Sequence, residues 1–190
     1  RAKTTMAPFV MCPTCHDEYE DISDRRFHAQ PVACLNCGPS YTLHQDGSTF
    51  NNLPEILDHT AHLVRLGAIV AVKGVGGFHL MCDAFDGAAV NRLRNSKRRE
   101  GKPFAVMFRD LECLEKYAVL SVEERSALLS WRRPIVVVET RKDLAEGVSR
   151  NLGTLGAFLP YMPWHTLFFE QSALEAVVLT SGNLAEEPIL

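Results

Sequence analysis

No stretch of this sequence stays apolar over the roughly 20 residues that a membrane-spanning helix needs. The first residues, RAKTTMAPF, also lack the apolar segment of a secretory signal. We therefore expect a cytoplasmic protein that does not enter a membrane. Positive charge is not in excess, because the net charge is −3, so binding of double-stranded RNA or DNA is not expected. The chain has no initiator methionine and no polar C-terminal tail, and we expect it to be a piece of a longer protein.

Two common phosphate-binding signatures are missing as well. The segment LGAIVAVKGVGGFHLMCDA at 66–84 indicates a strand followed by a glycine-rich turn, but no GK[ST] follows, which excludes a P-loop. The GxGxxG spacing of dinucleotide-binding proteins is absent too. Gly74, Gly76 and Gly77 would let a backbone approach a ligand closely. An ordinary turn uses glycine in the same way, so both interpretations stay open.

An alternation of helices and apolar strands follows residue 52. Five buried strands are expected, at 66–72, 103–108, 134–139, 155–160 and 176–181. The helices between them have recognisable start signals: Asn52 with Pro54, Asp86, Asp110, the capping box Ser121/Glu124 of a helix running to about Trp131, and Pro163. Helices that alternate with strands predict an open α/β layered sheet.

The six cysteines are distributed unevenly. CPTC at 12–15 and CLNC at 34–37 are separated by 18 residues, a spacing typical of a zinc site. Cys12, Cys15, Cys34 and Cys37 would fill all four positions of a zinc tetrahedron, so the zinc is expected to be structural. A redox pair or four unrelated thiols are the alternatives. Cys82 and Cys113 are interpreted as small buried hydrophobic residues.

These patterns divide the chain into a zinc module at 1–46 and a second domain at 47–190. The first 44 residues hold few aliphatic side chains, so metal binding would supply much of the folding free energy of the module. The stretch QDGSTFNN at 45–52 indicates a turn-rich linker.

Positive charge gathers at one place, NSKRREGKPFAVM at 95–107. Helical spacing puts Arg94, Lys97 and Arg98 on one face, and the end of a helix attracts cations in any case. The cluster also precedes a buried strand, and open α/β sheets bind ligands near strand ends. The motif LTSGN at 179–183 repeats that arrangement with three short polar side chains around a glycine. A phosphate site and a solvated helix end are both compatible with this pattern.

Three motifs in order resemble the YrdC-type fold that forms carbamoyl-adenylates. They are CDA at 82–84, KRR at 97–99 followed by KP, and TSGN at 180–183. With two CxxC pairs upstream, the chain resembles the HypF family of carbamoyltransferases in NiFe-hydrogenase maturation. The resemblance implies the second zinc module of that family and most of its YrdC-like domain.

The resemblance also implies roles for individual residues. A cationic triphosphate site falls on Lys97, Arg99 and Lys102, and nucleotide contacts at a strand end fall on Thr180, Ser181 and Asn183. The turn at 73–84 matches the family's acyl side, and we expect Lys73 and His79 there as catalytic residues that hold the carbamoyl group; a structural role is the alternative for a single histidine near a turn.

One segment departs from the related threonylcarbamoyl-adenylate synthases. Those enzymes have a pattern like PTxTxYGL where this chain has KGVGGFHL, so Gly74 and Gly76 replace two threonines. The departure disfavours threonine as a substrate and favours carbamate or carbamoyl phosphate.

The expected reaction is attack of carbamate, released from carbamoyl phosphate, on the α-phosphate of ATP with Mg²⁺. The carbamoyl group would then pass to a cysteine of a HypE-like acceptor protein. Threonylcarbamoyl-AMP synthesis for tRNA modification is the first alternative. A non-catalytic zinc ribbon that binds RNA or protein is the second, although the acidic loop at 16–33 disfavours phosphate contact.

Overall fold

The protein is described here by a computed structural model that covers residues 3–4, 6–99, 101–142, 144–150 and 152–183. The chain divides into two compact units, Arg1–Leu53 and Pro54–Leu190. We call them the cysteine unit and the sheet unit. Within the described ranges, no helix combines the length and the apolar character needed to cross a membrane.

The cysteine unit contains one helix and one hairpin. Helix α1 (Pro13–Glu20) starts with a proline in its first turn, directly after the first CxxC cysteine. Strands β1 (Leu43–Gln45) and β2 (Ser48–Phe50) pair antiparallel. The linker predicted at 45–52 is therefore wrong in part. Asp46 and Gly47 both have positive φ, and Asp-Gly is a preferred two-residue turn that joins hairpin strands.

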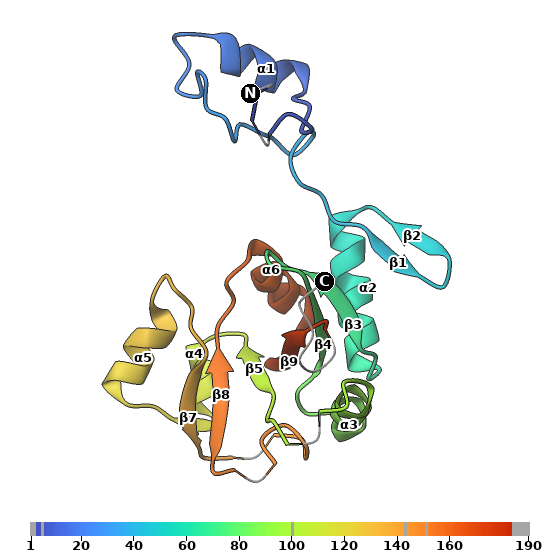
Figure 1. The fold of residues 1–190 in the computed structure, drawn as a ribbon, viewed down its shortest axis with the longest axis vertical. Helices are drawn as coiled ribbons and strands as arrows, with labels where there is room; N and C mark the ends of the chain where they lie inside the picture. Colours follow the sequence, from blue (N-terminus) through green and yellow to red (C-terminus); the bar gives the residue numbers. More distant parts are fainter. Residues whose placement is uncertain (1–2, 5, 100, 143, 151, 184–190) are drawn as a thin grey trace. The chain divides into compact units, whose positions relative to one another are not determined.

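The sheet unit is built on one mixed sheet of seven strands in the order β3-β4-β9-β5-β8-β7-β6 (Figure 1). All neighbours are antiparallel except β5 and β8. The strands are β3 (Val70–Lys73), β4 (Phe78–Asp83), β5 (Ala105–Phe108), β6 (Ala118–Val119), β7 (Val136–Thr140), β8 (Thr154–Phe158) and β9 (Ala176–Ser181). This arrangement confirms the predicted fold class, a small cysteine module followed by an open α/β sheet.

Two strands of this sheet, β4 and β6, were not predicted, and several predicted strands extend beyond the observed ones, most of all the strand at 66–72. The glycine-rich segment does not merely end a strand, because it joins β3 to β4 as a hairpin; β6 was also missed. The strand expected at 66–72 starts only at Val70. Gly67, with φ +83°, closes the preceding helix by donating to the Val64 carbonyl. Strand β3 is also an edge strand with exposed Ala71, and so is not fully buried.

Five helices pack around this sheet. They are α2 (Leu53–Arg65), α3 (Gly87–Ser96), α4 (Leu111–Glu115), α5 (Val122–Leu129) and α6 (Pro163–Ser172). The predicted caps are confirmed, since the side chains of Asp86, Asp110 and Ser121 all accept from backbone N–H groups. The helix expected to reach Trp131 ends at Leu129, because the backbone of Ser130 is extended.

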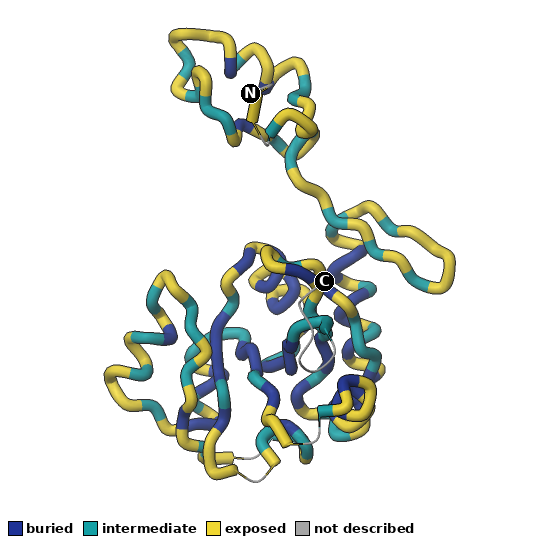
Figure 2. The backbone as a smooth tube through the Cα atoms, in the orientation of Figure 1, coloured by how far each residue is buried: buried dark blue, intermediate teal, exposed yellow. Residues whose placement is uncertain are grey.

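The core lies along the central strands, where buried residues continue through β5 and β9 (Figure 2). Cys82 and Cys113 are fully buried, as predicted. Strand β9 is buried up to Thr180, and its last residue, Ser181, lies opposite His79 of β4. The pairing therefore places the TSGN motif beside the start of β4, which is where the candidate site begins.

Candidate functional site

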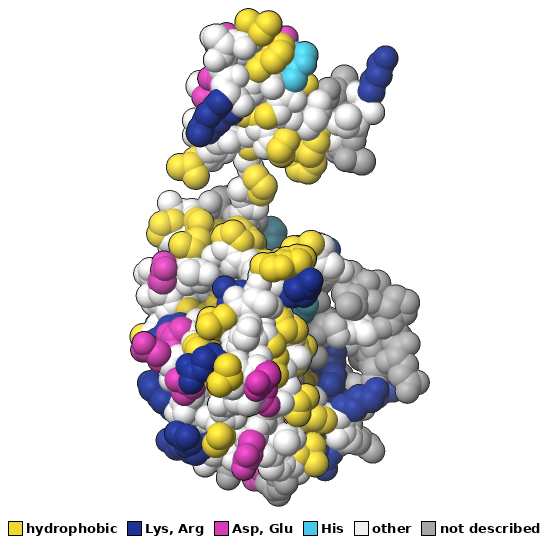
Figure 3. All heavy atoms as spheres, turned by 90° about the vertical axis from the view of Figure 1, so that its left-hand side faces the viewer, with side chains coloured by type: hydrophobic (Ala, Val, Ile, Leu, Met, Phe, Trp, Pro, Cys, Tyr) yellow, Lys and Arg dark blue, Asp and Glu magenta, His cyan; other side chains and the backbone are white. Residues whose placement is uncertain are grey.

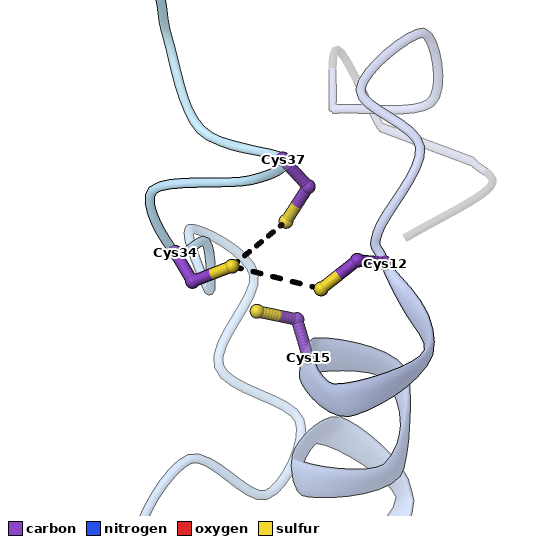
Figure 4. A group of neighbouring side chains, drawn as sticks. All are labelled: Cys12, Cys15, Cys34 and Cys37. Carbon is purple, nitrogen blue, oxygen red and sulfur yellow. Dashed lines mark hydrogen bonds between the residues drawn. The ribbon is translucent and has the colours of Figure 1, made fainter.

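The four cysteines of the CxxC pairs converge in the cysteine unit (Figure 4). Their sulfur atoms all lie within 4.8 Å of one another, and the Cys12–Cys34 and Cys34–Cys37 sulfurs are 3.6 and 3.9 Å apart. Tetrahedral zinc with Zn–S bonds of about 2.3 Å needs sulfurs roughly 3.8 Å apart. The geometry therefore fits a closed, structural zinc site with no position for a water ligand.

The surroundings of the thiols shift their pKa values in opposite directions. Burial, reinforced by the neighbouring thiols, raises the pKa of Cys15 to about 12. Backbone N–H groups of Cys12 and Cys34 lower the pKa of Cys37 to about 6. A bound Zn²⁺ would hold all four as thiolates, since a coordinating thiol loses its proton. Among the described residues, the buried core around the cluster consists of Cys15, Tyr19 and Val32, which agrees with the predicted dependence on metal.

A cavity of about 450 Å³ opens in the sheet unit, within the size range of small-molecule sites. It combines three arginines, three other polar residues and an apolar wall. The lining residues are Arg99, Arg132, Arg133, His79, Thr180, Ser181, Ala105, Ile135, Phe158, Tyr161 and Leu179. None of these described lining residues is Asp or Glu, so the cavity suits an anionic ligand with a flat apolar part.

Arg132 and Arg133 were not among the predicted site residues. They lie between α5 and β7, and Arg133 has φ 45° and donates to the Leu128 carbonyl at 3.2 Å. The signal was present as WRRP, which repeats the order seen at KRREGKP: a helix end, cations, a proline and a strand. From the side of α5 and β7, Lys and Arg side chains lie among hydrophobic ones (Figure 3).

Among the predicted phosphate ligands, Arg99 is the one that lines the cavity. Its guanidinium donates to the carbonyls of Lys102 (3.2 Å) and Pro103 (2.9 Å), and burial lowers its pKa. Lys102 is exposed and is not part of the lining. The pattern of three cations on one helical face is wrong for Arg98, because α3 ends at Ser96 and Arg98 has φ 49° and is exposed.

Lys97 is only 3% exposed and lies behind the lining. Its Nζ donates to the backbone carbonyls of Ser181 and Asn183, and burial lowers its pKa. Arg94 plays a similar structural part. It lies over the Phe104 ring at 4.6 Å and donates to the carbonyls of Arg99 and Lys102. The cation cluster thus shapes the loop that carries Arg99 and the end of β9.

The two residues predicted on the acyl side lie in different surroundings. Lys73 is exposed at the end of β3, with Nζ 4.7 Å from the Phe78 ring centroid, and it is outside the lining. His79 lines the cavity, opposite Ser181 in the β4–β9 register. Burial lowers the pKa of His79, partly offset by a hydrogen bond to the Gly77 backbone.

Comparison with known proteins gives consistent results for both units. The family described as "Telomere recombination" (Sua5, YciO and YrdC) matches residues 62–190, and the "HypF finger" matches residues 11–44. The chain is 46% identical, over 99% of its length, to the carbamoyltransferase HypF of Rhodobacter capsulatus. It covers 25% of that protein, so the chain spans about a quarter of the length of this curated relative.

Solved structures give the same result. A full-length HypF in its phosphate- and nucleotide-bound form is 47% identical, with a TM-score of 0.81 over 99% of this chain and 24% of its own. The HypF of T. kodakarensis is 41% identical, with a TM-score of 0.87 over 100% of this chain and 25% of its own.

Proposed function

The chain belongs to the Sua5/YciO/YrdC family and is of the HypF type, and from this premise we propose that its sheet unit forms carbamoyl-AMP from carbamate and ATP. A carboxylate oxygen of carbamate attacks the α-phosphorus of ATP. The bond from that phosphorus to the oxygen bridging to the β-phosphate breaks, and pyrophosphate leaves. No proton has to move, so the chemistry needs positioning and charge neutralisation more than a protein nucleophile.

The observation that carries this proposal is the cavity of about 450 Å³ with Arg99, Arg132 and Arg133 in its lining. Two anions must meet there, and arginine can bind phosphate oxygens in a bidentate manner. Phe158 and Tyr161 offer aromatic faces to the adenine, and the hydroxyls of Thr180 and Ser181 suit ribose or phosphate oxygens. The related full-length HypF in a nucleotide-bound form supports a nucleotide ligand.

The remaining roles follow from the resemblance and from position. We assign Lys97 to holding the TSGN strand end, with Asn183, and Lys102 to the outer phosphates. Lys73 would attract the carbamoyl anion at the mouth of the site, and His79 would contact it inside. Since none of the described lining residues is a carboxylate, Mg²⁺ would arrive with ATP and be held by its phosphate oxygens.

In the longer protein, we propose that carbamoyl phosphate is the source of carbamate and that a HypE-like protein accepts the carbamoyl group on a cysteine. This would place the reaction in the cytoplasm, within NiFe-hydrogenase maturation. Threonylcarbamoyl-AMP synthesis is the second candidate, because the sheet unit has the fold of the wider family. Binding of RNA or protein by the cysteine unit alone is the third.

The test measures pyrophosphate released from ATP by the zinc-loaded chain. Ammonium carbamate is one substrate and threonine with bicarbonate is the other; the longer parent chain is tested with carbamoyl phosphate. We expect release with carbamate only. Arg132→Ala and Arg99→Ala should each lower the rate by at least about tenfold, whereas Arg141→Ala, outside the cavity, should not. Release with threonine and bicarbonate only would instead support threonylcarbamoyl-AMP synthesis for tRNA modification.

A further inference from the structure

We propose that Gly74 and His79 act as one acyl selector, in which His79 is a neutral hydrogen-bond acceptor for the NH₂ group of carbamate and Gly74 makes room for its ring. This inference rests on the proposed adenylation and concerns how the cavity recognises the carbamoyl group. It gives Gly74 a role in specificity, although Gly74 is not among the residues that line the cavity.

The first observation is the contact between the two residues. A Cβ on Gly74 would lie 2.7 Å from His79 Nδ1 and 2.8 Å from its Cε1. Ordinary side chains do not pack this closely, so any other residue at 74 would push the ring of His79 away. The backbone of Gly74 has no positive φ, so the glycine serves space and not backbone conformation.

The same turn offers a matched position for comparison. A Cβ on Gly76, two residues along the hairpin loop, would meet nothing within 4 Å. The two glycines that replace threonines in the motif pattern therefore differ physically. Of the two, Gly74 is the one where a side chain would collide with His79, so the histidine at 79 explains the glycine at 74.

The second observation concerns the charge of His79. Burial lowers the pKa of His79, while a hydrogen bond to the Gly77 backbone opposes part of this shift, and the Gly77 carbonyl accepts from the Gly74 N–H at 2.8 Å. A neutral imidazole that donates from one nitrogen to a carbonyl keeps the other as an acceptor. The charged groups in the same lining are Arg99, Arg132 and Arg133, and none of the described lining residues is a carboxylate, so a further positive charge on His79 is opposed.

A second imidazole, which contacts the cavity lining, also supports a neutral His79. His165 of α6 is 3% exposed, and its Nδ1 has no hydrogen-bond partner within the described part of the chain. Its ring meets Tyr161 edge-on at 4.6 Å, and Tyr161 lines the cavity. Charge on His79 is among the causes that lower the pKa of His165, so the two rings interact and both resist protonation.

The chemistry of carbamate uses such an acceptor. Its carboxylate oxygen is the nucleophile, and its NH₂ group is a hydrogen-bond donor. A protonated His79 would pair with the nucleophilic oxygen and reduce its reactivity. A neutral His79 would instead bind the NH₂ and leave the oxygen free. Acetate has the same shape with a methyl group in place of NH₂, and it cannot make this hydrogen bond.

The experiment compares pyrophosphate release with ammonium carbamate and with acetate, at pH 8.5, for five forms of the zinc-loaded chain: wild type, His79→Ala, Gly74→Ala, the double variant and Gly76→Ala. We expect the wild type to prefer carbamate by at least about tenfold. His79→Ala and Gly74→Ala should each bring the preference to within about threefold of unity. Gly74→Ala should add nothing in the His79→Ala background, and Gly76→Ala should match the wild type.

Two further measurements separate the possible failures. ATP binding by calorimetry should stay within about threefold in all five forms, because the selector does not contact the nucleotide. Imidazole ¹⁵N shifts should show His79 neutral at pH 7, with a changed tautomer or position in Gly74→Ala. If the wild type binds ATP but releases no pyrophosphate with carbamate, the proposed reaction fails. If the reaction works but His79→Ala keeps the preference, or Gly76→Ala acts like Gly74→Ala, the selector alone is overturned.

Discussion

The side-chain amine of Lys97 lies 2.6 Å from the carbonyl oxygen of Asn183, although 86 residues separate the two in the chain. The same amine also donates to the carbonyl of Ser181. Lys97 follows α3, and the other two residues end and follow β9. A buried ammonium group therefore joins the cation cluster to the TSGN strand end.

The first prediction concerns this link. Lys97→Met keeps the length of the side chain but leaves two carbonyls without their donor, so the sheet unit should lose about 1.5–3 kcal/mol of unfolding free energy. ATP binding should weaken with it, because Thr180 and Ser181 lose their support. Urea unfolding followed by tryptophan fluorescence measures the first effect. Lys102→Met, at an exposed position, should unfold as the wild type does. Equal stability of the two variants would refute the link.

The second prediction concerns Gly182, which packs against the start of β4. A Cβ there would lie 2.9 Å from the Phe78 carbonyl oxygen, which already accepts from the Gly182 N–H at 2.6 Å. Gly182→Ala should therefore cost about 1–3 kcal/mol of stability and weaken ATP binding. Gly153→Ala serves as the control, since its Cβ would meet nothing within 4 Å. Calorimetric melting temperatures and ATP affinities of both variants test this prediction. A Gly182→Ala variant with the stability and ATP affinity of the wild type would contradict the described packing.

The third prediction is a pH dependence from His165. Burial, followed by the charge of His79, lowers the pKa of His165 from 6.5 to about 4. Between these values the unfolded chain binds a proton that the folded chain does not. The unfolding free energy is therefore unaffected by His165 above about pH 6.5. It falls as the pH drops toward 4, by up to about 3 kcal/mol.

His165→Phe should remove this contribution, so that the variant gains stability relative to the wild type as the pH is lowered from 7 to 4. Urea unfolding at several pH values gives the difference directly. Gly153→Ala, whose added Cβ would meet nothing within 4 Å and which adds no titratable group, should run parallel to the wild type. A constant difference between His165→Phe and wild type across this range would show that folding does not change the pKa of His165, which would contradict the lowered pKa.

The fourth prediction concerns the metal. One zinc ion per chain should be bound. A strong chelator should unfold the cysteine unit while the sheet unit keeps its structure, because three of the described residues form the buried core around the cysteines. Backbone NMR spectra before and after chelation report on each unit. Cys34→Ser should already show the unfolded signals, with no further change on chelation. Unchanged signals in α1 after loss of zinc would contradict the assignment.

Local signals in the sequence were sufficient for much of the fold. Asp86, Asp110 and the Ser121–Glu124 box predicted three helix starts, because a cap is a hydrogen bond between residues two or three apart. The two CxxC pairs predicted the cysteine cluster because their spacing is typical of a zinc site. Strand β4 was missed because its glycine-rich turn masked the hairpin, and its pairing with β9 joins segments about 100 residues apart.

Short-range patterns and the order of motifs along the chain were enough to predict the cysteine cluster, three helix starts and the family. The three-dimensional structure was needed to show that Arg132 and Arg133 line the same cavity as Arg99, that Lys97 is buried, and that a Cβ at position 74 would meet the ring of His79. These relationships depend on strand order and side-chain packing. Both arise from contacts between segments distant in sequence, and no local pattern records them.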